Sequence, residues 1–149
     1  MIASALRVLQ AVVRVPLVRD PMNTNTSISL AGRARSLRSA LAGMRVLVGS
    51  QRNAWIHLAA TVAVVATGLS FGLSAAQWAL VTVAVAWVWT AEAINTAFEL
   101  LADAVAPEFN PLIGKAKDVA AGAVLIAAIG AAAIGLLVFV PEIADWMAR

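Results

Sequence analysis

An uncharged apolar run from Val119 to Val140 constrains this chain more than any other feature. About 20 predominantly apolar residues are enough for a helix to cross the roughly 30 Å hydrocarbon core of a bilayer. Backbone amides in lipid must be satisfied within the segment, which favours a helix. The composition agrees, because 62% of the 149 residues are hydrophobic and 13% are charged, against about 45–50% and about 25% in soluble domains. We predict an all-α integral membrane protein and exclude a soluble globule, a disordered chain and a polar nucleic-acid-binding protein.

The hydropathy pattern predicts three transmembrane helices, over residues 57–76, 77–105 and 119–140. Pro141 is predicted to end the third of them. Residues 33–53 have an apolar stripe at helical spacing beside basic residues, which is typical of an amphipathic helix on the membrane surface; the stripe is Leu37, Leu41, Met44 and Val48. We expect one membrane domain over residues 33–149. Residues 1–32 are an N-terminal extension, either a further surface helix or disordered.

The basic residues predict the orientation of the chain in the membrane. Of the 11 Lys and Arg residues, eight precede the first predicted span, and Lys115 and Lys117 lie between the second and the third. Because Lys and Arg accumulate in cytoplasmic loops, the N-terminus is predicted to be cytoplasmic. His57, the only histidine, lies at the edge of the first predicted span. We expect it to have an interfacial or packing role there.

Four polar residues interrupt the second predicted span, at Glu92, Asn95, Glu99 and Asp103. At about 100° per residue, they fall within about 80° of one helix face. A charge at the bilayer centre costs about 2.5–3.5 kcal/mol, so such residues usually face protein and mark a functional site. Helix packing through hydrogen bonds is the alternative, but a single Asn or Glu would be enough for it. Carboxylates spaced in this way suit two tasks, ligation of Mg²⁺ and acceptance of a proton.

Lys117 and Asp118 open the third predicted span. Asp118 at a helix start is a plausible N-cap. Lys117 either anchors the helix at the cytoplasmic interface or, together with the helix dipole, holds a phosphate group. Metal-binding carboxylates, a buried base and a phosphate-binding lysine are the parts that phosphoryl transfer needs. A second hypothesis is a small ion- or proton-conducting membrane subunit in which Glu92 and Glu99 are relay groups.

Three short motifs in the second half of the chain carry a family resemblance. They are Glu92-Ala93-Ile94-Asn95-Thr96-Ala97-Phe98-Glu99, Pro107-Glu108-Phe109-Asn110-Pro111-Leu112 and Lys115-Ala116-Lys117-Asp118. With them the chain resembles the prokaryotic diacylglycerol kinase and undecaprenol kinase family over roughly residues 33–140. The resemblance implies a homotrimer in the bacterial inner membrane, with active sites between subunits near the cytoplasmic face. It also implies that MgATP phosphorylates the hydroxyl of a membrane lipid, undecaprenol or diacylglycerol.

The same resemblance implies a role for each matching residue. Glu92 matches the catalytic base and, with Asn95, a contact to the lipid substrate. Glu99 matches a metal-binding carboxylate that also contacts ATP, and Gln51 stands at the position of a second metal ligand. The other expected ATP-binding residues, among which Lys117 neutralises the phosphates, are Glu108, Asn110, Lys117 and Asp118.

Two positions depart from the family pattern. The family typically has Glu where this chain has Gln51, and many members have His where it has Asn110. Because Gln keeps a carbonyl oxygen and loses the charge, we expect weaker binding of Mg²⁺.

Overall fold

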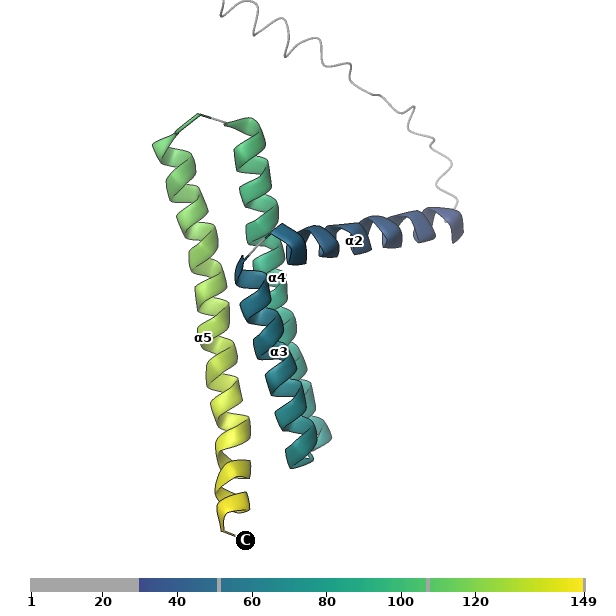
Figure 1. The fold of residues 1–149 in the computed structure, drawn as a ribbon, viewed down its shortest axis with the longest axis vertical. Coiled ribbons are helices and arrows are strands. Elements are labelled where there is room, and N and C mark those ends of the chain that lie inside the picture. Colours follow the sequence, from purple (N-terminus) through teal and green to yellow (C-terminus); the bar gives the residue numbers. More distant parts are fainter. Residues whose placement is uncertain (1–29, 51, 107, 149) are drawn as a thin grey trace, which may run out of the picture. The chain divides into compact units, whose positions relative to one another are not determined.

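The computed structural model describes residues 30–50, 52–106 and 108–148, which form four helices (Figure 1). The helices are α2 (Leu30–Ser50), α3 (Arg52–Phe71), α4 (Ala75–Val105) and α5 (Pro111–Met147). The all-α prediction, with one N-terminal helix before three long apolar ones, is confirmed. The chain divides into two compact units with the boundary between Ser39 and Ala40, and the second unit contains α3, α4 and α5. Residues 1–29 of the predicted extension lie outside the described residues, and the domain limits stay a prediction.

Three helices are long and apolar enough to span a membrane, over Asn53–Phe71, Ala75–Val105 and Pro111–Met147. At about 1.5 Å per residue, the 19 residues of the first extend about 28 Å, close to the thickness of a hydrocarbon core. The 31 and 37 residues of the other two extend about 46 and 55 Å. Figure 1 shows α4 and α5 continuing past the start of α3. The last turns of α4 and the first turns of α5 therefore extend past the start of α3, and both helices are longer than a hydrocarbon core requires.

The turn between α3 and α4 lies earlier than the sequence analysis predicts. Gly72 has a φ of +68°, a left-handed conformation that glycine adopts without strain. Its backbone N–H and that of Leu73 both donate to the Gly68 carbonyl, at 3.1 and 3.2 Å, and so close the end of α3. Ser74 and Gln77 then form a reciprocal capping box at the start of α4. The predicted span limits at about residues 76 and 77 differ from the helix limits at Phe71 and Ala75, because hydropathy alone does not detect these end signals.

α5 is longer at both ends than the predicted third span. It begins at Pro111, a residue that suits a first helical turn, after Asn110, whose Oδ1 accepts from the Leu112 N–H at 2.9 Å. Asp118 is therefore not an N-cap. Pro141 lies inside the helix and does not end it. Tertiary contacts hold both sides of this proline, since Val138 is in the apolar core and Glu142 Oε1 accepts from Gln77 Nε2 at 2.7 Å.

The apolar core lies near the turn between α3 and α4. Leu73, Val81 and Val138 are buried in one cluster with contributions from all three helices. α3 and α4 approach closely there, because a Cβ atom placed on Gly68 would lie 2.9 Å from Cη2 of Trp78. The opposite end, where α3 begins, carries the polar residues described next.

Candidate active site

Glu92 is the most deeply buried polar residue among those that the structure describes. Its side chain is 1% exposed, and neither carboxylate oxygen has a hydrogen-bond partner. The nearest basic group is the His57 imidazole, whose Nε2 lies 3.9 Å from Oε2 of Glu92. This distance is too long for a hydrogen bond and leaves the pair only electrostatically linked. A buried carboxylate in this condition is costly and is characteristic of a functional site.

The carboxylate of Glu92 borders a pocket of about 250 Å³ between α3, α4 and α5. α4 contributes the polar wall, while α5 contributes small and apolar side chains. The lining residues are Asn53, Ile56, His57, Glu92, Asn95, Glu99, Ala121, Val124, Leu125 and Ala128. The structure thus brings together three of the four residues of the predicted polar stripe.

Asn95 and Glu99 form the outer part of that wall. Asn95 is 4% exposed, and its Nδ2 donates to Oε1 of Glu99 at 3.0 Å. Oδ1 of Asn95 and the hydroxyl of the neighbouring Thr96 are buried without a hydrogen-bond partner. The hydrogen bond from Asn95 holds one carboxylate oxygen of Glu99, and Oδ1 of Asn95 is available as an acceptor.

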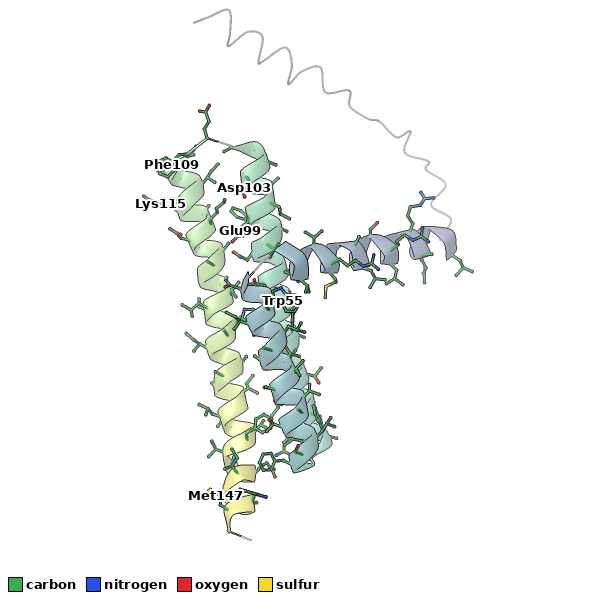
Figure 2. The ribbon with its side chains drawn as sticks, viewed as in Figure 1. Trp55, Glu99, Asp103, Phe109, Lys115 and Met147 are labelled. Atoms are coloured by element: carbon green, nitrogen blue, oxygen red, sulfur yellow. The ribbon has the colours of Figure 1, made fainter. Side chains whose placement is uncertain are left out.

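Asp103, the fourth residue of the stripe, has a different partner. It is 68% exposed and forms an ion pair with Lys117 of α5, which is 33% exposed. The tight connection between α4 and α5 brings these residues together although they are 14 positions apart. Figure 2 shows Glu99 and Asp103 on α4 and Lys115 on α5 at the same end of the helices. Lys117 is the seventh residue of α5, so the predicted support from the helix dipole is wrong, because that effect is confined to the first turn.

The other predicted nucleotide contacts lie apart from the pocket lining. Glu108 is exposed in the connection between α4 and α5, and Asp118 is exposed on α5. The side chain of Asn110 is engaged in capping α5. Gln51, the predicted second metal ligand, lies outside the described residues. Glu108, Asn110 and Asp118 therefore lie outside the pocket lining, and of the predicted site residues that the structure describes only Glu92, Asn95 and Glu99 line the pocket.

The donor atoms of the pocket are suitable for Mg²⁺. Within residues 30–50, 52–106 and 108–148, no three His, Asp or Glu side chains converge as a metal cage. Mg²⁺ is commonly held by one or two carboxylates together with substrate phosphates and water, so a complete protein cage is not required. Glu99, the carboxylate of the pocket that is not fully buried, fits such a site.

The sequence analysis predicts an interfacial or packing role for His57, and that role stays a prediction. The structure adds that His57 lines the pocket at 16% exposure, with its Nε2 3.9 Å from Oε2 of Glu92. One signal in the sequence could have pointed to His57 as a pocket residue. It is a single histidine about one helical turn after the start of an apolar span that has no charged residue. Its proximity to Glu92 depends on how α3 packs on α4, which periodicity does not reveal.

The sequence model for prokaryotic diacylglycerol kinase matches residues 38–139. The chain belongs to this family. It is 36% identical over 94 residues to an undecaprenol kinase of Bacillus subtilis (strain 168), covering 63% of this chain and 76% of that protein. It is 33% identical over 133 residues to a diacylglycerol kinase of Synechocystis sp., covering 89% of this chain and 76% of that protein. No solved structure matches the chain significantly.

Family membership makes this protein a lipid kinase, a phosphotransferase with an alcohol group as acceptor. It agrees with the three helices that are long and apolar enough to span a membrane. The matched segment contains the pocket residues Glu92, Asn95 and Glu99 as well as Lys117. Membership therefore favours the kinase hypothesis over an ion- or proton-conducting subunit.

Proposed function

We propose that this lipid kinase transfers the γ-phosphoryl group of ATP to the hydroxyl of undecaprenol or diacylglycerol at the cytoplasmic face of the bacterial inner membrane. The observation that carries the proposal is the Glu92 carboxylate, which is buried, without a hydrogen-bond partner, and on the wall of a pocket. A base in that condition needs an incoming donor, and a lipid hydroxyl supplies one.

A second pocket supports a lipid as the acceptor. It has a volume of about 250 Å³, and its lining is almost entirely apolar, with Val64, Val85 and Ile134 among its residues. It shares His57 and Ala128 with the polar pocket, so the two are adjacent. A molecule with a hydroxyl at one end and a hydrocarbon chain at the other matches this pair of pockets.

In the proposed reaction Glu92 accepts the proton of the lipid hydroxyl as the oxygen attacks the γ-phosphorus and ADP leaves. Asn95 lines the same pocket beside Glu92 and contacts the lipid acceptor. The low exposure of both side chains excludes water, which would otherwise compete as the acceptor of the phosphoryl group. The chain thus supplies positioning and a base, two of the contributions on which phosphoryl transfer depends.

We propose that Lys117, Glu108, Asn110 and Asp118, on α5 and in the connection before it, hold the nucleotide. Lys117 exchanges its partner Asp103 for the phosphates of ATP, while Glu108, Asn110 and Asp118 contact the rest of the nucleotide. The exchange is energetically accessible because an exposed ion pair is worth only about 0–1 kcal/mol. Glu99 would hold Mg²⁺, which when bound neutralises charge on the phosphates; Gln51 would be a weak second ligand.

We further propose a homotrimer with the N-terminus in the cytoplasm. The distribution of Lys and Arg supports this orientation. α5 supports close association, because Gly122 and Gly130 would each accept a Cβ atom with no other atom within 4 Å. Such small residues let helices of neighbouring subunits approach in lipid.

The test uses the full chain, purified in detergent and reconstituted in lipid bilayers, with labelled ATP, Mg²⁺ and either undecaprenol or diacylglycerol. We expect label in one or both lipids, and none when the lipid alcohol is omitted. Glu99→Gln should raise the Mg²⁺ concentration needed for half-maximal rate. Failure to label either lipid by folded, oligomeric protein would overturn the proposal, and ATP-independent proton flux into proteoliposomes would favour the conducting subunit.

A further inference from the structure

We propose that His57 is a positioning residue that receives the proton from Glu92 after each transfer and thereby returns Glu92 to its carboxylate form. The inference rests on the proposed function and deepens it. It begins from the geometry of the pair, in which Nε2 of His57 lies 3.9 Å from Oε2 of a carboxylate that has no hydrogen bond.

Glu92 needs a second group to accept its proton, because its side chain is buried away from solvent. At 1% exposure its carboxyl group cannot pass a proton directly to bulk water. His57 is 16% exposed and lines the same pocket as Glu92, so its imidazole is more accessible than the buried carboxyl group. Histidine is the side chain best suited to accept and release a proton near neutral pH.

No other side chain of the pocket competes for this role. From α3 the lining contains Asn53 and Ile56, and from α5 only alanine, valine and leucine. The remaining titratable group is Glu99 on α4, a full two turns from Glu92 along the helix and hydrogen-bonded to Asn95. Within this lining, His57 is thus the one basic group that faces Glu92.

A hydrogen-bond chain holds His57 at the level of Glu92. The indole Nε1 of Trp89 on α4 donates to Oγ1 of Thr61 on α3 at 3.1 Å. The Thr61 hydroxyl in turn donates to the backbone carbonyl of His57 at 2.7 Å. Trp89 precedes Glu92 by three residues, so this chain sets the register of α3 against α4 beside the pair. The proximity of His57 and Glu92 is therefore built into the helix packing.

The proton path balances with the phosphoryl transfer. The lipid oxygen forms a bond to the γ-phosphorus of ATP, the bond to the β–γ bridging oxygen breaks, and its electron pair leaves with ADP. The lipid proton passes to Oε2 of Glu92 and then to Nε2 of His57, which gains one positive charge and later releases the proton to water. The pair must close by about 1 Å to reach hydrogen-bond distance, which is feasible because no hydrogen bond restrains the carboxylate.

The experiment measures lipid phosphorylation by full-length variants in the same bilayers, as a function of pH and of added imidazole. His57→Ala should lower kcat about tenfold to a hundredfold, less than the about 10²–10⁴-fold effect typical of the direct base. The KM for ATP should be unchanged. Millimolar imidazole should restore much of the rate, because it can occupy the space left by the side chain and accept the proton.

Two further variants separate proton transfer from packing. His57→Gln is similar in size and polar but accepts no proton, so it should be as impaired as His57→Ala and not respond to imidazole. Leu58→Ala removes a neighbouring side chain of α3 that lines neither pocket and should keep the wild-type rate and pH profile. Full activity of His57→Gln, or loss of activity in His57→Ala without rescue by imidazole in an intact oligomer, would overturn the inference.

The proposed function and this inference fail in different ways. If the wild-type protein phosphorylates neither lipid, the proposed function is wrong. If wild type is active, Glu92→Gln is inactive and the His57 variants are fully active, only the role of His57 is wrong.

Discussion

Glu92→Gln should reduce activity and increase stability at the same time. Glutamine has nearly the same shape, so the substitution removes the charge and the base and leaves the packing of α4 in place. Loss of a general base lowers rates by about 10²–10⁴-fold, which corresponds to about 3–5 kcal/mol of transition-state stabilisation at 1.36 kcal/mol per tenfold. We expect kcat to fall by that factor for whichever lipid is the substrate.

The gain in stability follows from the burial of Glu92. Its carboxylate is 1% exposed, has no hydrogen bond, and has only His57 at 3.9 Å as a compensating group. A membrane-buried charge costs about 2.5–3.5 kcal/mol at the bilayer centre and less toward the interface. Because His57 lies about one turn inside the start of the α3 span, we expect Gln to stabilise the protein by about 1–2 kcal/mol, or about 2–8 °C in Tm for a domain of this size.

The assay pairs lipid phosphorylation with thermal unfolding of the detergent-solubilised protein. Glu142→Gln is the matched control, since its carboxylate already accepts a hydrogen bond from Gln77 at 2.7 Å and lies outside both pockets. It should keep full activity and show equal or lower stability. A Glu92→Gln protein that is active, or one that is inactive because it unfolds at a lower temperature, would refute the reasoning.

Three further predictions concern other parts of the molecule. Gly68→Ala should lower the free energy of unfolding by about 1–3 kcal/mol in thermal unfolding, because the new Cβ atom would meet the Trp78 ring at 2.9 Å; unchanged stability would show that the turn is loosely packed. Asp103→Asn should cost at most about 1 kcal/mol, since the ion pair with Lys117 is exposed; a larger loss would mean that subunit association shields the pair. Gln51→Glu should lower the Mg²⁺ concentration needed for half-maximal activity, and an unchanged requirement would separate this position from the metal.

The sequence by itself determined the features that depend on local pattern. Long, predominantly apolar runs identified three helices able to span a membrane, because the cost of placing charge in lipid acts on each segment separately. The helical repeat placed Glu92, Asn95 and Glu99 on one face, and all three line one pocket. The motifs around these residues also indicated the family, since they contain the polar side chains that a spanning helix otherwise avoids.

Tertiary structure decided what depends on contacts between helices. Asn110, and not Asp118, caps α5, and the helix continues through Pro141 because Val138 and Glu142 are held by α4 and the apolar core. The ion pair of Asp103 with Lys117 and the position of His57 opposite Glu92 follow from the packing of α4 against its neighbours. Hydropathy and periodicity describe one helix at a time, whereas these pairings depend on the register between helices, which side-chain packing and interhelical hydrogen bonds determine.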